Sequence, residues 1–295
     1  MKRVAILLFG VSVYAMFLGV FLYAVGFVGN FLVPTRLDGV AELPIAQALS
    51  INLLLLALFA VQHSVMARPW FKKSWTRFVP EPIERSTYVL CTNIVLALLY
   101  WQWQPIGGTV WDVQHWWGRA MLYGLFAFGW LTVLVTTFLI NHFDLFGLRQ
   151  VWLYFRGKHY TSLGFTTPGP YRFVRHPMYI GWLTAFWATP TMTVAHLTFA
   201  LGITLYILVA IYFEERDLVR FLGQDYADYR KNVPMLIPSV PSRSETLGPC
   251  QLAPVSEHTV SEHTVTEHTA TEHTASLEDS NVSLRQPVAN IELTR

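Results

Sequence analysis

The chain has 295 residues, of which 53% are hydrophobic and only 14% are charged, and its formal net charge at pH 7 is +2. Soluble globular domains carry about 25% charged residues, so this composition excludes an ordinary soluble domain. The 20 Phe, 13 Tyr and 11 Trp exclude a fully disordered chain, and two cysteines are too few for a disulfide-stapled secreted domain. The composition therefore predicts a protein whose main solvent is lipid.

Apolar stretches divide the chain into candidate membrane spans. The stretches that lack Asp, Glu, Lys and Arg cover residues 4–35, 43–67, 86–111, 120–143 and 176–213. Because a transmembrane helix needs about 20 apolar residues, the first four predict single helices at about 6–33, 45–66, 87–104 and 119–141. The fifth has room for two, at about 177–193 with a kink near Pro190 and from about 196 to a cap at Gly223. We therefore predict an all-α polytopic membrane helix bundle of about six spans that ends in a helical hairpin.

The charges predict how this bundle lies in the membrane. Residues 1–238 hold 18 Lys and Arg against 11 Asp and Glu, and the positive residues are concentrated in alternate loops. Since positive loops favour the cytosolic side, we expect both termini in the cytosol, with a bacterial cytoplasmic membrane as the host. Basic residues between apolar runs indicate lipid headgroups as partners and no nucleic acid. The first apolar run is too long for a signal-peptide core, so we expect it to remain uncleaved.

Residues 239–295 differ from the rest of the chain. They hold 3 Lys and Arg against 8 Asp and Glu, and they repeat a five-residue unit, Val-Ser-Glu-His-Thr and its variants. With no large apolar side chain to bury in the repeats, this low-complexity tail is expected to be disordered. Four regularly spaced histidines in it lack anything that would fix a coordination geometry, so we predict no metal site. The predicted organisation is a membrane domain over 1–238 and a tail over 239–295.

Polar residues inside the membrane domain gather at one predicted face. Because such residues are costly in lipid, their clustering indicates a functional site, here a pocket that faces the cytosol. The clusters are 62–64, 84–88, 141–150, and 171–179 together with Glu214 and Glu215. Structural interpretations also fit: His63 as a hydrogen-bonding residue of the bundle, Glu84 and Arg85 as helix-end charges, and the arginines before His176 as interface anchors.

The last of these clusters has the clearest chemistry. Gly169 and Pro170 predict a turn, and the pair His176-Pro177 then begins a membrane helix whose first N–H groups have no partner within the helix. A helical hairpin would bring His176 to the depth of Glu214. Carboxylates, an imidazole and aromatic faces suit a zwitterionic nucleoside ligand that carries a soft cation such as a sulfonium.

The same residues resemble a known superfamily. Arg-His-Pro-Met-Tyr-Ile-Gly at 175–181, Glu-Glu at 214–215 and Phe-Leu-Gly-Gln-Asp-Tyr-Ala-Asp-Tyr at 221–229 resemble the isoprenylcysteine carboxyl methyltransferase and phospholipid methyltransferase superfamily. The resemblance covers about residues 160–238, and it implies that this block binds S-adenosylmethionine. The implied cofactor-binding residues are Tyr171, Arg172, Arg175, His176, Pro177, Met178, Tyr179, Glu214 and Glu215.

Motifs nearer the N-terminus discriminate within that superfamily. Gln-His-Ser-Val-Met-Ala-Arg at 62–68, Glu-Arg-Ser-Thr-Tyr at 84–88 and Asn-His-Phe-Asp-Leu-Phe-Gly at 141–147 resemble the methanethiol S-methyltransferase family, relatives of NnrU-type proteins. This implies methyl transfer from S-adenosylmethionine to a small thiol, with dimethyl sulfide as the product. The alternatives are a prenylcysteine or phospholipid methyltransferase, a sterol-type reductase that binds a nicotinamide cofactor, and a haem- or quinone-associated protein. The sequence does not give an oligomeric state.

A thiol reacts as its thiolate, so the predicted chemistry needs a proton acceptor. His142 is our candidate, with Asp144 orienting its ring and Arg149 favouring the thiolate by charge. Bulky Phe143, Phe146 and Trp152 would then form a small pocket, and a cap or interface anchor at 142–144 is the structural alternative.

Overall fold

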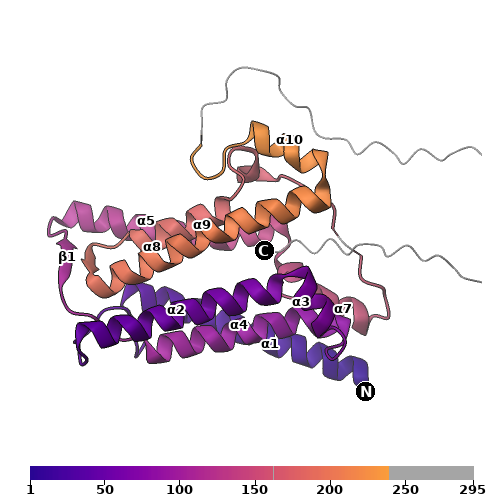
Figure 1. Ribbon diagram of the computed structural model, residues 1–295, viewed down its shortest axis with the longest axis horizontal. Helices are drawn as coiled ribbons and strands as arrows, with labels where there is room; N and C mark the ends of the chain where they lie inside the picture. The colour runs from indigo at the N-terminus through magenta and orange to yellow at the C-terminus, as the bar shows by residue number, and fades with distance from the viewer. Residues whose placement is uncertain (162, 239–295) are drawn as a thin grey trace, which may run out of the picture. The chain divides into compact units, whose positions relative to one another are not determined.

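The computed structural model describes residues 1–161 and 163–238, so the predicted tail over 239–295 lies outside the described residues. The described part is mainly helical, as Figure 1 shows. Its helices are α1 (Lys2–Gly29), α2 (Ile45–Ala67), α3 (Pro69–Trp75), α4 (Glu81–Gln102), α5 (Trp116–Ile140), α6 (His142–Leu145), α7 (Leu148–Phe155), α8 (Pro177–Trp187), α9 (Val194–Leu222) and α10 (Gln224–Asn232). Two strands, β1 (Thr109–Asp112) and β2 (Thr191–Thr193), and a 3₁₀ turn at Gly169–Arg172 complete it.

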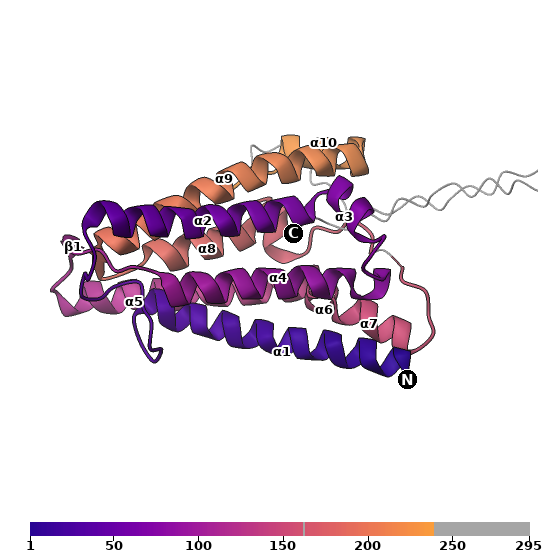
Figure 2. The ribbon, with the colours of Figure 1, turned by 60° about the horizontal axis from the view of Figure 1, so that its bottom comes forward.

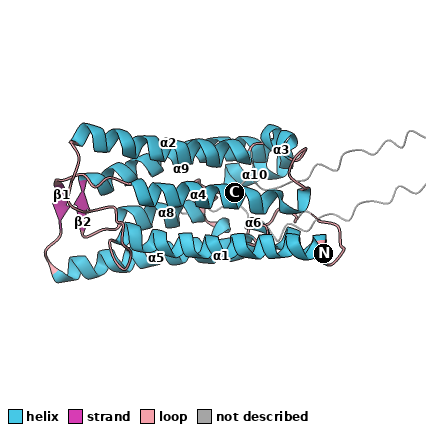
Figure 3. Cartoon of the chain, turned by 90° about the horizontal axis from the view of Figure 1, so that it is seen from below, coloured by secondary structure: helices cyan, strands magenta, loops and turns pink. Residues whose placement is uncertain are grey.

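Six helices form the bundle. In Figure 1, α5, α8 and α9 lie above α1, α2 and α4, and Figure 2 shows α7 beside the beginning of α1 with α6 further along it. Helix α4 packs between α1 and α2, while α5 packs on α8 and α2 on α9. Strands β1 and β2 lie at the opposite end of the bundle from the N-terminus (Figure 3). We call the two ends the α6 end and the sheet end.

The outer faces of the bundle are apolar. Helices α1, α2, α5 and α9 are long and apolar enough to cross a membrane. Leucines on their outer faces, such as Leu22, Leu54 and Leu205, are 65–70% exposed, which suits contact with lipid and would be costly in water. The all-α membrane class is therefore confirmed. Helix α4 begins with charged residues, and α8 has only 11 residues, about 16 Å at 1.5 Å per residue, so the count of six spans stays a prediction.

The hairpin of α8 and α9 is confirmed, but the predicted helix over 177–193 is wrong at its C-terminal end. Helix α8 stops at Trp187, and Thr191–Thr193 pairs antiparallel with Thr109–Asp112. Pro190 has no N–H to continue a helix; its carbonyl instead accepts from the N–H of Val113 at 2.9 Å. The hydrogen-bond partners of this segment lie far away in sequence, which is why local patterns did not predict the strands.

Two glycines set the distance between α5 and α8. A Cβ on Gly129 would lie 2.6 Å from the backbone nitrogen of Ala185, and one on Gly181 would lie 2.9 Å from the carbonyl oxygen of Gly129. Small residues allow membrane helices to approach closely. This contact fixes α8, and α8 begins at the predicted site.

Replacing Gly181 by Val should therefore separate α8 from α5. Two of the three nearest atoms are backbone and cannot rotate away, so we expect a loss of about 1–3 kcal/mol in stability. The measurement is the thermal midpoint of the purified protein in detergent. The matched control is Gly124→Val on α5, where an added Cβ would meet no atom within 4 Å. Equal midpoints for both variants would contradict the assigned role of the α5–α8 contact.

Candidate active site

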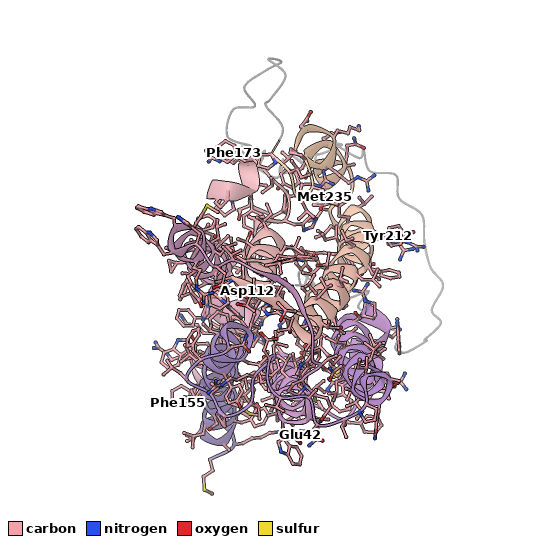
Figure 4. The ribbon with its side chains drawn as sticks, turned by 90° about the vertical axis from the view of Figure 1, so that its left-hand side faces the viewer. Glu42, Asp112, Phe155, Phe173, Tyr212 and Met235 are labelled. Carbon is pink, nitrogen blue, oxygen red and sulfur yellow. The ribbon has the colours of Figure 1, made fainter. Side chains whose placement is uncertain are left out.

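A cavity of about 270 Å³ lies inside the bundle, between α1, α2, α4, α5, α8 and α9. Figure 4 looks along these helices from the sheet end, where Asp112 is labelled. The charged and imidazole side chains of the lining lie toward the α6 end and include Arg85, His142, His176 and Glu214. With His63, which also lines it, the cavity joins residues from all four polar clusters recognised in the sequence.

The start of α8 meets the end of α9 as the hairpin predicted. His176 Nε2 lies 3.0 Å from Glu215 Oε1, and His176 Nδ1 lies 3.8 Å from Glu214 Oε2. The hydroxyl of Tyr179 donates to Glu214 Oε2 at 3.0 Å. His176 and Glu214 are each 3% exposed. The expected proximity of this imidazole to the two carboxylates is confirmed.

The predicted cofactor residues divide into two groups. Tyr171, His176, Met178, Tyr179 and Glu214 line the cavity, whereas the other four do not belong to its described lining. Those four are Arg172, Arg175, Pro177 and Glu215. The structure therefore brings about half of the predicted set to one surface.

Arg175 has a structural role, because its side chain joins three segments. Its Nε donates to Glu215 Oε1 at 2.7 Å, and its Nη1 donates to the carbonyl of Arg230 at 3.0 Å and to that of Val233. It therefore ties the loop before α8 to both α9 and the end of α10. Arg172 is exposed, and Pro177 supplies the first residue of α8, as predicted.

Backbone N–H groups around the start of α8, which were expected to be available to a ligand, donate to carbonyl groups of the protein. The N–H of Arg175 donates to the carbonyl of Pro234 at 2.9 Å, and that of His176 donates to the carbonyl of Met235 at 3.2 Å. The N–H of Tyr179 donates to the carbonyl of His176 at 3.1 Å. The prediction that the first N–H groups of this helix are available to a ligand is therefore wrong for His176 and Tyr179, because the segment after α10 and the first turn itself satisfy them.

His142 occupies the α6 end of the cavity and is 2% exposed. Thr137 Oγ1 donates its one proton to the carbonyl of Leu134 at 2.6 Å, so at 2.8 Å it accepts from His142 Nδ1–H. Nε2 is then unprotonated and accepts from the hydroxyl of Tyr14 at 2.7 Å. Burial lowers the pKa of His142 from its ordinary value. The ring is thus a neutral imidazole with its basic nitrogen defined.

The predicted partnership of His142 with Asp144 and Arg149 is wrong. Arg149 Nη1 lies 3.0 Å from Asp144 Oδ1 and also donates to the carbonyl of Thr161 at 2.8 Å. The hydroxyl of Tyr160 donates to the other Asp144 oxygen at 3.1 Å. Residues two apart on a helix face about 200° apart, so Asp144 points away from the ring of His142. Asp144 and Arg149 form an ion pair that holds α6, α7 and the following loop, outside the described cavity lining.

The aromatic residues near His142 also differ from the prediction. Phe146 lines the cavity and stacks on Phe17 with ring centroids 3.7 Å apart. Phe143 and Trp152 are about half exposed, at 50% and 48%. They do not narrow the pocket, which is larger than the sequence suggested.

Arg85 and His63 take places in the cavity that sequence reasoning did not give them. Arg85 is 5% exposed, its Nε donates to the carbonyl of Leu145 at 2.7 Å, and its guanidinium lies 5.0 Å from the ring centroid of Tyr88. His63 lies beside the Tyr88 hydroxyl, with Nε2 at 2.9 Å. Both belong to motifs recognised in the sequence, yet helix-end charges and internal hydrogen bonds explained those motifs equally well. Arg85 is distinguished by its burial and by its place in the described cavity lining.

Comparison with known proteins identifies the family. No family model matches the chain, and no solved structure matches it. The chain is similar to a protein named methanethiol S-methyltransferase from Crocosphaera subtropica, with 55% identity over 244 residues that cover 83% of this chain and 96% of the relative. A protein of the same name from Mycobacterium tuberculosis is 56% identical over 238 residues, which cover 81% and 98%. Nurim from Mus musculus is 33% identical over 183 residues, which cover 59% and 69%. Since the first two relatives match over nearly their entire lengths, the chain belongs to the methanethiol S-methyltransferase family.

Proposed function

We propose that the chain transfers the methyl group of S-adenosylmethionine to methanethiol and releases dimethyl sulfide and S-adenosylhomocysteine. The observation that carries the proposal is a cavity that joins a carboxylate and imidazole pair, Glu214 and His176, to a neutral imidazole, His142, and a buried cation, Arg85. The printed names of the similar proteins supply the substrate. The distribution of Lys and Arg among the loops favours six spans and an orientation in which the cavity opens to the cytosol.

The donor set at the start of α8 fits S-adenosylmethionine. Glu214 offers a carboxylate for the ammonium or for a ribose hydroxyl, while Tyr171 and Tyr179 offer aromatic rings that attract a soft cation. When bound, this molecule supplies an electrophilic methyl group on a sulfonium sulfur. His176, Met178 and Tyr179 complete the wall, and Arg175 and Glu215 act as positioning residues that hold His176 in place.

The residues at the α6 end prepare the nucleophile. Arg85 lowers the cost of the thiolate by placing a fixed positive charge beside it in an apolar wall. His142 Nε2 takes the thiol proton, and the thiol replaces the hydroxyl of Tyr14 as the partner of that nitrogen. Thr137 keeps the opposite nitrogen protonated throughout, which leaves Nε2 as the basic atom. The new S–C bond then forms as the sulfonium C–S bond breaks.

Replacing Glu214 by Gln should weaken the binding of S-adenosylmethionine about 10- to 100-fold. The carboxylate is assigned a charge-assisted hydrogen bond to the ligand, which contributes about 1–3 kcal/mol. Isothermal titration calorimetry with the purified protein measures the loss. The matched control is Glu81→Gln, an exposed glutamate at the start of α4 outside the described cavity lining. Parent-like affinity in Glu214→Gln would remove Glu214 from the cofactor site.

The proposed methylation of methanethiol can be tested in cells that express the chain. Cells that express the chain and are fed methanethiol should accumulate dimethyl sulfide in the headspace, measured by gas chromatography, above cells with an empty vector. Expression of Glu214→Gln at the same level should reduce this accumulation. The absence of dimethyl sulfide in cells that hold the folded protein in their membranes would contradict the proposed function.

A further inference from the structure

The cavity is much longer than a one-carbon thiol requires. Its lining on α4 extends from Arg85 to Tyr100, and its lining on α9 extends from Glu214 to Phe199. Each pair is separated by about 22 Å at 1.5 Å of helix rise per residue. The cavity therefore runs from the α6 end far toward the sheet end, along the axis of the bundle.

The chemistry of the lining changes along this length. Toward the sheet end the described lining includes Ala24, Val28, Leu99, Trp130 and Phe199 and holds no Asp, Glu, Lys, Arg or His. We call this part of the cavity the apolar chamber. The charged groups of S-adenosylmethionine would lose their hydration there without gaining partners, so they belong at the α6 end, beside Glu214. The apolar chamber suits an uncharged hydrocarbon group.

The position of the apolar chamber relative to the nucleophile site assigns its occupant. A thiol whose sulfur lies beside Arg85 and His142 can direct its substituent along the cavity axis. The substituent then points away from the charged side chains of Arg85 and Glu214 at the α6 end. A one-carbon substituent would leave the apolar chamber empty, and empty apolar space lowers stability in proportion to its volume. A longer alkyl substituent would fill it and gain hydrophobic contact.

We infer that this enzyme also methylates straight-chain alkanethiols of intermediate length, with the alkyl chain in the apolar chamber. The inference rests on the proposed function and extends its substrate class from methanethiol to apolar thiols. The reaction is the same: the thiolate sulfur bonds to the methyl carbon of S-adenosylmethionine, the C–S⁺ bond breaks, and the thiol proton goes to His142. The products are an alkyl methyl sulfide and S-adenosylhomocysteine.

The test is a substrate series with the purified full chain in detergent. Methanethiol, 1-butanethiol, 1-hexanethiol and 1-octanethiol are each offered with S-adenosylmethionine that carries a CD₃ group, and the labelled sulfides are measured by mass spectrometry. We expect every member up to 1-hexanethiol to be methylated, with KM falling up to about threefold per added methylene. Methylation of methanethiol without methylation of the longer thiols would overturn this inference alone. Failure to methylate any thiol would overturn the proposed function as well.

A variant that fills the apolar chamber tests whether the alkyl group of the substrate binds there. Ala24 lies on α1 and lines the cavity, so Ala24→Phe should lower kcat/KM for 1-hexanethiol at least tenfold and that for methanethiol less than threefold. Ala15→Phe, on the exposed face of the same helix, is the matched control and should change neither value. Ala24→Leu provides a smaller substitution if the Phe variant does not fold. An equal loss for both thiols, or no loss for either, would place the alkyl chain elsewhere and overturn the inference.

Discussion

His142→Ala should lower kcat for methanethiol at pH 7 by about 100- to 10,000-fold, the usual contribution of a positioned general base. Because burial lowers the pKa of His142, the ring is neutral and able to accept a proton at pH 7. The parent should therefore lose activity only when the pH falls below the ordinary pKa of a histidine side chain. The variant depends on thiol that ionises in solution, so its activity should rise about tenfold per pH unit toward alkaline pH. The measurement is the pH profile of kcat/KM for both proteins.

Two controls separate this role from a structural one. His142→Ala should bind S-adenosylmethionine as the parent does, because the proposed cofactor residues lie between the 3₁₀ turn and the first turn of α8 and on α9. Tyr14→Phe removes the hydroxyl that contacts Nε2 and should retain activity at pH 7, since the thiol replaces that contact. If His142→Ala is fully active at neutral pH, the base is another group. If Tyr14→Phe is as inactive as His142→Ala, the proton passes through Tyr14 instead.

Arg85→Gln should lower kcat/KM for methanethiol at pH 7 by about 100-fold, the scale observed when one electrostatic contact to a developing or bound anion is removed. Arg85→Lys keeps the charge and should recover a large part of this loss, although it loses the directed bond to the carbonyl of Leu145. Steady-state kinetics with the three proteins in detergent measures the effect, with thermal midpoints as a check on folding.

Arg149→Gln provides the discriminating comparison. Arg149 is the arginine that the sequence suggested for the thiolate, but it pairs with Asp144 outside the described cavity lining. We expect its replacement to lower the thermal midpoint while leaving the kinetics of the folded protein within about threefold of the parent; a partly exposed ion pair contributes only about 0–1 kcal/mol. A large kinetic loss in Arg149→Gln together with parent-like kinetics in Arg85→Gln would restore the assignment made from sequence.

The long helices were predictable because each depends on local composition. The charge-free stretches located α1, α2, α5 and α9 within a few residues, and Gly223 caps α9 with φ 61° as expected. Strands β1 and β2 were missed because three or four residues carry little periodicity and pair only with each other, about 80 positions apart in the chain. The predicted helix over 177–193 is longer than α8 because a proline can kink a helix or follow its end, and Pro190 lies beyond the end of α8 at Trp187.

The site was predictable as a set of clusters but not as a set of contacts. One-sided clustering of polar residues identified the segments that meet at the α6 end. Which side chain of a segment faces inward depends on the rotation of each helix, and the sequence does not define that rotation for short elements such as α6 and α7. Arg85 and Arg149 illustrate the point: both are arginines in recognised motifs, yet only Arg85 belongs to the described cavity lining. The resemblance to known methyltransferases gave the family correctly and could not make this distinction.

Transfer of the labelled methyl group tests the central claim most directly. The purified chain in detergent is incubated with methanethiol and S-adenosylmethionine carrying a CD₃ group, and the headspace and the solution are analysed by mass spectrometry. The account predicts dimethyl sulfide with one CD₃ group, formed in equal amount with S-adenosylhomocysteine and abolished when either substrate is omitted. Label that appears only in lipid or in protein, or S-adenosylmethionine that stays intact while methanethiol is present, would contradict it.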